Sequence, residues 1–156
     1  MREFRKWSSV LYLNMGSYLD RELAPFEINN SQYFYILKIC EKPGITQDCI
    51  LATMHRSPSN VTRALAQLEE KGYIARKPSE RDKRTCRLYP TPKATAAYGG
   101  IVAVVEESAR KVLEPFTEEE RALLPRLLER AARSAEALNR PAPPEQDEQD
   151  RILQKE

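Results

Sequence analysis

The chain contains no long run of apolar residues and no recognisable signal peptide. No segment approaches the roughly 20 apolar residues that a helix needs to span a bilayer. The charged N-terminus, residues 1–7, is not followed by an apolar stretch with a cleavage site. We therefore expect no membrane segment and a cytoplasmic location. Hydrophobic residues still make up 41% of the 156 residues, which is enough to form the core of one domain with a helical annex.

Histidine and cysteine are scarce, with one histidine and three cysteines in the whole chain. A metal site needs clustered ligands, and His55 has no partner at ligand spacing, so we expect no metal site. An odd number of cysteines, Cys40, Cys49 and Cys86, does not make a disulfide framework and favours reduced thiols. The sequence also lacks a Gly-rich phosphate loop and a recognisable nucleophile–base pair. It therefore predicts neither an enzyme nor a cofactor.

Net charge is small, but the charge is unevenly distributed along the chain. The whole sequence has 25 basic and 23 acidic residues, a net charge of +2. Residues 56–93 contain ten Lys or Arg and four Asp or Glu, so 10 − 4 gives +6 there and +2 − 6 leaves −4 elsewhere. A basic segment on an acidic body is typical of a phosphate-binding surface. The alternative is an ordinary solvated surface.

The order of elements in residues 46–91 is helix, turn, helix, strand, loop, strand. Thr46 can cap the first helix. Ser57 is a suitable N-cap for the second helix, Pro58 suits its first position, and Gly72 can end it in the left-handed conformation. Segments 73–77 and 85–89 have strand character, and the basic loop 79–84 joins them. This order predicts a winged helix-turn-helix, a DNA-binding fold.

The second helix of this pair has one apolar and one polar face. At about 100° per residue, the apolar side chains share one stripe, which we expect to pack inward: Val61, Ala64, Leu65 and Leu68. The opposite side carries Ser59, Thr62, Arg63, Ala66 and Gln67, with Asn60 at its edge. Such a polar face can read base edges in the major groove. Arg63 could contact a guanine edge, and Asn60 or Gln67 could pair with adenine.

Four sequence motifs in this region resemble the MarR family of bacterial transcriptional regulators. They are the Thr62-Arg63 pair in the second helix, the exit Leu68 to Ile74, the loop Asp82-Lys83-Arg84, and Thr91 to Ala94. The resemblance covers about residues 30–95 and extends by layout to the flanking helices. It implies a homodimer on a pseudo-palindromic operator in double-stranded DNA. It also implies that Arg84 enters the minor groove and that Asp82 braces its guanidinium.

The candidate DNA-binding residues lie on the helix pair, the strands and the loop between the strands. They are Thr46, Ser57, Ser59, Asn60, Thr62, Arg63, Gln67, Arg76, Lys77, Arg81, Asp82, Lys83 and Arg84.

The flanking segments predict dimerisation helices. Residues 2–22 carry an apolar stripe at helical spacing, namely Phe4, Trp7, Leu11, Met15 and Tyr18. A long helix starts at Thr91-Pro92, with Gly99-Gly100 expected to loosen it. The capping box at Thr117 opens a last helix, which Pro125 should kink. These stripes are too large for one winged helix to bury, so a second copy is expected to cover them.

The predicted fold class is mainly α with a small β-hairpin wing: a winged helix-turn-helix plus N- and C-terminal dimerisation helices. Residues 1–28 and 92–138 form the dimerisation region, 29–91 the DNA-binding domain, and 139–156, which are polar and proline-rich, a disordered tail.

The sequence leaves the regulatory signal open. The family usually places a ligand cleft between the dimerisation helices and the DNA-binding lobe, and three tyrosines and a methionine could line it: Tyr12, Met15, Tyr18 and Tyr33. They suit a small aromatic or phenolic ligand that releases a repressor from DNA. The alternatives are a thiol switch at Cys40, Cys49 or Cys86, although Cys40 fits a core position, and a winged helix that binds only other proteins.

Overall fold

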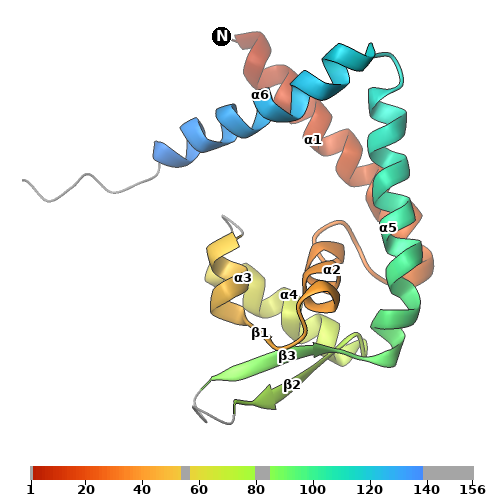
Figure 1. Cartoon of the computed structure of the whole chain (residues 1–156), viewed down its shortest axis with the longest axis vertical. Helices are drawn as coiled ribbons and strands as arrows, with labels where there is room; N and C mark the ends of the chain where they lie inside the picture. The colour runs from red at the N-terminus through yellow and green to blue at the C-terminus, as the bar shows by residue number, and fades with distance from the viewer. Residues whose placement is uncertain (1, 54–56, 80–84, 139–156) are drawn as a thin grey trace, which may run out of the picture. The chain divides into compact units, whose positions relative to one another are not determined.

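A computed structural model describes residues 2–53, 57–79 and 85–138 of the chain. The chain divides into two units, Met1–Pro115 and Phe116–Glu156 (Figure 1). In chain order, the first unit contains α1 (Arg2–Leu23), η1 (Ala24–Phe26), α2 (Tyr33–Glu41), β1 (Ile45–Thr46), α3 (Gln47–Thr53), α4 (Pro58–Glu70), β2 (Ile74–Pro78), β3 (Cys86–Pro90) and α5 (Pro92–Leu113). The second unit contains α6 (Glu118–Ala137).

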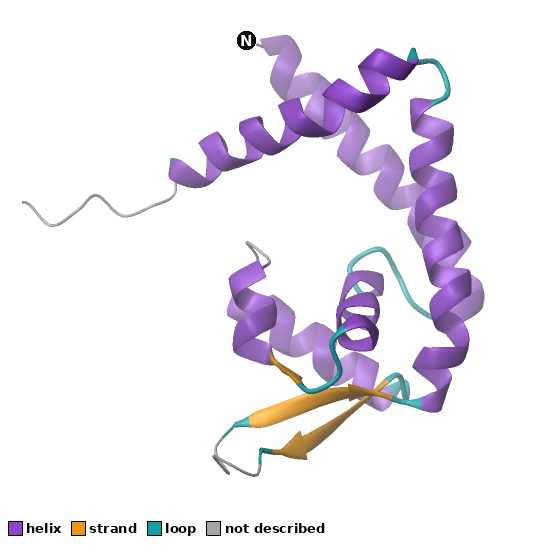
Figure 2. Ribbon diagram, in the orientation of Figure 1, coloured by secondary structure: helices purple, strands orange, loops and turns teal. Residues whose placement is uncertain are grey.

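The predicted fold class is confirmed, because helices dominate and the strands form a small antiparallel sheet in the order β1-β3-β2 (Figure 2). β2 and β3 form the predicted hairpin, with Arg76 opposite Leu88. β1 was not predicted. In it, Ile45 pairs with Leu88 and Thr46 with Arg87. A strand of two residues is too short to show the alternation by which strands are recognised in a sequence.

The ends of α4 follow the predicted signals with one exception. Pro58 is the first helical residue, and Gly72 follows the helix with a φ of +74°, the left-handed conformation. The expected side-chain cap from Ser57 is wrong. Its hydroxyl makes no capping hydrogen bond to a backbone amide of the helix and instead forms a hydrogen bond of 3.4 Å with the hydroxyl of Ser59. The carbonyl oxygen of Ser57 instead accepts from the backbone amide of Asn60 at 3.0 Å.

The core of the first unit is centred on α2. Tyr35, Ile36 and Ile39 are fully buried there. α2 packs against α5 and β3. The other core residues come from the neighbouring elements: Leu19, Leu23, Ile28, Ile45, Ile50, Val61, Ala64, Leu65, Leu68, Tyr73, Ile74, Leu88, Ala94 and Ile101. This core fixes the orientation of α4, whose apolar stripe is part of it.

A glycine in α5 makes room for an aromatic ring. α5 is an unbroken helix through Gly99 and Gly100, whereas the sequence suggested a looser segment there. A Cβ atom on Gly100 would lie 2.7 Å from Cζ of Phe26 in η1. The missing side chain therefore lets η1 pack closely against α5. Close packing, rather than flexibility, explains this glycine.

Both terminal helices expose apolar side chains. The first half of α1 is exposed throughout, and Trp7 has 57% of its surface accessible. Thr117 forms the predicted capping box with Glu120 at the start of α6, and the helix continues through Pro125. No described residue of α6 is buried, although Leu123, Leu127 and Leu128 are large and apolar. Within the described ranges, no helix is long and apolar enough to cross a membrane.

Candidate nucleic-acid interface

The outer face of α4 is polar and accessible. Val61, Ala64, Leu65 and Leu68 are buried on the inner face, as predicted. The exposed residues include Ser59, Asn60, Thr62, Arg63 and Gln67. The 13-residue helix thus presents a guanidinium, two amides and hydroxyl groups on one accessible surface, which we call the α4 polar face.

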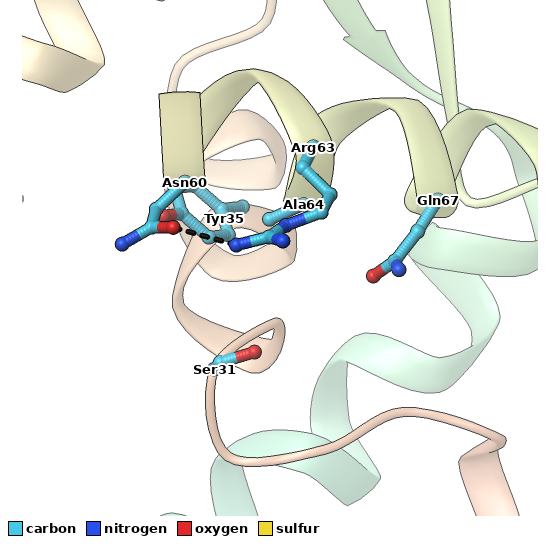
Figure 3. A pocket seen from close by; sticks show the side chains of 6 residues that line it. All are labelled: Ser31, Tyr35, Asn60, Arg63, Ala64 and Gln67. Carbon is cyan, nitrogen blue, oxygen red and sulfur yellow. Dashed lines mark hydrogen bonds between the residues drawn. The ribbon is translucent and has the colours of Figure 1, made fainter. Parts of the chain in front are cut away.

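Arg63 and Asn60 form a pair on this face. Nη2 of Arg63 donates to Oδ1 of Asn60 at 2.7 Å (Figure 3). The two residues are three positions apart, a spacing that brings helical side chains together. The guanidinium is held beside the helix while its other N–H groups can meet a ligand, because an arginine has five donors.

Gln67 is held by a buried glutamine, Gln32, that no sequence motif indicated. Nε2 of Gln32 donates to Oε1 of Gln67 at 2.9 Å. Oε1 of Gln32 accepts from Nζ of Lys71 at 3.1 Å and from the backbone amide of Asn29 at 3.3 Å. Only 1% of the surface of Gln32 is accessible. Its position just before the apolar α2 was the available sequence signal, but a glutamine there is usually an ordinary surface residue.

Two threonines among the predicted DNA contacts have structural partners. Oγ1 of Thr62 accepts from Nε2 of Gln47 at 2.8 Å, which joins α3 to α4, and donates to the carbonyl of Pro58 at 3.0 Å. Oγ1 of Thr46 accepts from the backbone amide of Cys49 at 3.3 Å, so Thr46 caps α3 as predicted. These bonds stiffen the helix pair and leave the two hydroxyls fewer free positions for DNA.

The basic residues of the sheet are used in different ways. Nε of Arg76 bonds Oε2 of Glu69 at 3.0 Å, which ties β2 to α4. Nη1 of Arg87 donates to the carbonyl of Gly44 at 3.0 Å. Lys77 is exposed, and its ammonium lies 5.2 Å from the centre of the Tyr89 ring. Among the described strand residues, Lys77 therefore remains the more available cation.

Two lysines clamp the connection between α1 and α2. Nζ of Lys71 donates to the carbonyl of Glu27 at 2.7 Å. Nζ of Lys93 donates to Oε2 of Glu27 at 3.1 Å and to the carbonyl of Lys71 at 3.0 Å. The hydroxyl of Tyr73 donates to the carbonyl of Phe26 at 2.7 Å. The net charge of +6 counted in residues 56–93 therefore overstates the positive charge available to DNA phosphates. A count from the sequence includes lysines, such as Lys71 and Lys93, that bond to groups within the protein.

Several predicted contacts lie outside the described residues. They are Arg81, Asp82, Lys83 and Arg84. His55 also lies outside them, and the described part of the chain holds no group of three potential metal ligands.

A polar pocket of about 230 Å³ lies beside the α4 polar face (Figure 3). Ser31, Tyr35, Asn60, Arg63, Ala64 and Gln67 line it. The sequence did not predict this pocket, because it forms between α4 and α2, which are separated along the chain.

A second pocket, of about 170 Å³, lies between α1 and α5. Leu11, Asn14, Met15, Tyr18, Ser108, Lys111 and Val112 line it. The structure thus brings together Met15 and Tyr18 of the four predicted ligand residues. Tyr12 and Tyr33 do not line this pocket: Tyr12 is highly exposed, and Tyr33 packs partly buried against the core. Lys111 was not predicted, because it stands on a charged stretch of the long helix.

Lys111 supplies a positive charge at this second pocket. Its Nζ donates to the hydroxyl of Tyr18 at 3.2 Å and lies 5.2 Å from the centre of that ring. The hydrogen bond to Tyr18 raises the pKa of Lys111, and Glu107 raises it further. The ammonium is therefore protonated at neutral pH. An apolar pocket with an ammonium at its edge suits an aromatic anion, which would share that ammonium with the Glu107 carboxylate, 3.6 Å away.

The cysteines differ in environment. Cys40 is half-buried and belongs to the packing around α2, whereas Cys49 and Cys86 are exposed. Burial raises the pKa of the Cys40 thiol, and the nearby Glu41 carboxylate raises it further. A protonated thiol is a poor nucleophile. The environment of Cys40 therefore speaks against a thiol switch at that position.

Known proteins resemble this chain in both sequence and structure. The MarR family model matches residues 28–86. The HTH-type transcriptional regulator YybA of Bacillus subtilis is 30% identical over 115 residues, which cover 74% of this chain and 77% of the relative. The transcriptional regulator SlyA superposes with a TM-score of 0.80 at 26% identity, covering 85% of this chain and 93% of that one.

A solved complex with DNA is also similar. A MarR family transcriptional regulator from Listeria monocytogenes, crystallised with 26mer DNA, superposes with a TM-score of 0.77. It is 26% identical to this chain, and the match covers 83% of this chain and 86% of the Listeria protein.

Proposed function

Because the chain belongs to the MarR family of DNA-binding transcriptional regulators, we propose that it is a homodimeric repressor that a small aromatic ligand releases from its operator. Members of this family are regulators and not enzymes. The observation that carries the proposal is the α4 polar face. It combines Arg63 with two amide side chains on a helix whose other face is anchored in the core. A helix of this kind can enter the major groove and meet base edges.

The exposed apolar residues of α1 and α6 support the homodimer. Phe4, Trp7 and Leu13 in α1, and Leu127 and Leu128 in α6, are large apolar side chains in contact with solvent. Solvation of such residues is unfavourable, and a second copy of the chain offers matching apolar helices. A dimer also presents two α4 helices, which corresponds to an operator with two-fold symmetry.

The loop between β2 and β3 is proposed to contact the minor groove. The role of Arg84, with Asp82 bracing its guanidinium, rests on the sequence motif, since residues 80–84 lie outside the described ranges. An arginine in a narrow A·T-rich minor groove gains from the concentrated negative potential there. The MarR family protein from Listeria, crystallised with 26mer DNA, supports a DNA-bound arrangement for this fold.

Selection of duplexes from a random pool tests the proposal. We expect the full-length chain to enrich a site of two inverted half-sites, with A·T-rich pairs where each loop reaches the minor groove. Binding should weaken steeply as salt rises, because each phosphate contact releases counterions. Recovery of unrelated duplexes, or an affinity that does not change with salt, would contradict the proposal. A winged helix that binds only proteins would retain no duplex at any salt concentration.

The pocket between α1 and α5 is the proposed ligand site. Met15 and Tyr18 form apolar walls, and Lys111 can pair with a carboxylate. We expect hydroxybenzoate to release the protein from its selected duplex, and Lys111→Met to weaken that release about tenfold while DNA affinity without ligand stays the same. Fluorescence anisotropy of the labelled duplex measures both quantities. Lys38→Met is the matched control, because Lys38 is a lysine on α2 that does not line this pocket. Equal release from Lys111→Met and the parent would remove the pocket from the mechanism.

A further inference from the structure

The amide of Gln67 is held in one orientation by a chain of hydrogen bonds that begins at groups that can only donate. The ammonium of Lys71 and the backbone amide of Asn29 both donate to one atom of the Gln32 side chain. That atom must be the oxygen, Oε1, because an amide nitrogen is not an acceptor. The other end of Gln32 is therefore Nε2, a donor, and it lies 2.9 Å from Gln67.

The atom of Gln67 that meets Gln32 must then be its acceptor. Oε1 of Gln67 accepts this bond, and Nε2 of Gln67 is left for other partners. Burial of Gln32 makes the arrangement costly to reverse, because a turned amide would place donors against Lys71 and the Asn29 amide. The sequence alone allowed Gln67 to pair with adenine through both of its atoms, whereas the structure commits one of them.

Asn60 follows the same rule. The guanidinium of Arg63 can only donate, so the Asn60 atom at 2.7 Å is Oδ1. Figure 3 shows the Asn60 nitrogen on the side away from Arg63. With both amide oxygens engaged within the protein, the three long polar side chains of the α4 polar face, Asn60, Arg63 and Gln67, offer mainly N–H groups.

We propose that Gln32 is a specificity-determining positioning residue, which orients Gln67 so that α4 reads keto bases, guanine or thymine, in the major groove. Guanine O6 and thymine O4 are acceptors, whereas adenine and cytosine present an amino group at the corresponding place. An outward Nε2 can donate to O6 or O4 of the first pair and meets a competing donor at that position in the second, whereas N7 accepts in both purines and does not discriminate between them. The inference rests on the proposed role of α4 in reading base edges.

The isosteric substitution Gln32→Glu tests this orientation. One carboxylate oxygen can still accept from Lys71 and from the Asn29 amide, but the other oxygen can now only accept from Gln67. Gln67 must turn its amide to donate to it, which directs Oε1 outward. The base read by Gln67 is the one whose preference is lost in Gln67→Ala. At that base, we expect Gln32→Glu to move the preference from guanine or thymine to adenine or cytosine. The change in relative affinity should be roughly fivefold for each half-site.

Asn29→Asp is the matched control. It adds the same charge three residues away, and its side-chain oxygen can still accept from the amide and hydroxyl of Ser31. We expect both Gln32→Glu and Asn29→Asp to lose a little overall affinity for DNA because of the added negative charge. Asn29→Asp should keep the base preference of the parent. Duplex selection with the parent and each variant measures the preference. A Gln32→Glu protein that keeps the keto preference overturns the inference.

A protein without sequence preference and a variant that does not fold give results of their own. If the parent selects no defined sequence, the proposed function fails, and Gln32 has no readout to control. If thermal unfolding shows that Gln32→Glu does not fold, Gln67→Glu replaces it, because Gln32 then still donates to residue 67 and a carboxylate oxygen faces the groove. A preference for cytosine or adenine from Gln67→Glu supports the inference, and an unchanged keto preference overturns it.

Discussion

Leu128→Glu, and separately Leu11→Glu, should abolish the dimer and with it specific DNA binding. Leu11 lies in α1 and Leu128 in α6, and each exposes a large apolar side chain, 38% and 50% accessible. If a second copy covers these residues, a carboxylate there must lose its water without gaining a partner. An uncompensated buried charge costs on the order of 3 to 5 kcal/mol, and the two-fold dimer bears that cost twice. Light scattering should report a monomer or aggregates.

The control for this experiment is Ser9→Glu. Ser9 is an exposed residue of α1, and the apolar stripe of that helix does not include it. The variant should remain a dimer with parental affinity for DNA. The proposed architecture would be abandoned if the unmutated chain is a stable monomer at micromolar concentration, or if both leucine variants stay dimeric and bind their operator. Circular dichroism shows whether each variant is folded.

Arg63→Ala should produce the second large effect, on operator affinity and on base preference together. A bidentate contact between a guanidinium and guanine discriminates by about 1–3 kcal/mol. A dimer carries two copies of Arg63, so the loss for the whole operator should be about 2–6 kcal/mol if the two half-sites act independently. Removal of the guanidinium also releases the Asn60 amide, which relaxes the neighbouring position further. Selection from a random pool should return degenerate half-sites.

Lys77→Ala serves as the comparison for Arg63→Ala. Lys77 is exposed on β2, and if it meets only phosphate its loss should weaken binding to all duplexes alike. The slope of log affinity against log salt should fall by about one for each protomer. If Arg63→Ala also leaves the selected motif intact and changes only the salt slope, Arg63 contacts the backbone and not the bases.

The sequence predicted those features that depend on local order along the chain. The helical periodicity of the apolar residues in α4 predicted its inner face. Gly72 predicted the end of α4, and Thr117 predicted the start of α6. These signals act within one or two turns of helix, so a linear pattern contains them. The family motifs located the winged helix-turn-helix for the same reason.

Features that depend on contacts between distant segments could not be predicted. Gln32 and Gln67 are 35 positions apart, and Lys71 and Glu27 are 44 apart. No sequence periodicity relates such pairs. In the sequence, a lysine that donates to a backbone carbonyl cannot be told from a lysine that binds a DNA phosphate. The pocket at Lys111 could not be predicted for the same reason, because α1 and α5 contact each other only in the folded chain. The two-residue strand β1 depends on β3 for its hydrogen bonds.

Hydrogen bonds connect the α1–α2 connection to the end of α4 and the start of α5. Phe26 and Glu27 are bonded by Tyr73, Lys71 and Lys93, which lie at the exit of α4 and the start of α5. Any displacement of this connection relative to α4 must break several of these bonds at once. Packed and hydrogen-bonded elements tend to change between discrete arrangements rather than deform gradually. These bonds therefore couple the angle of α4, the helix that we propose to face DNA, to the position of the segment that follows α1.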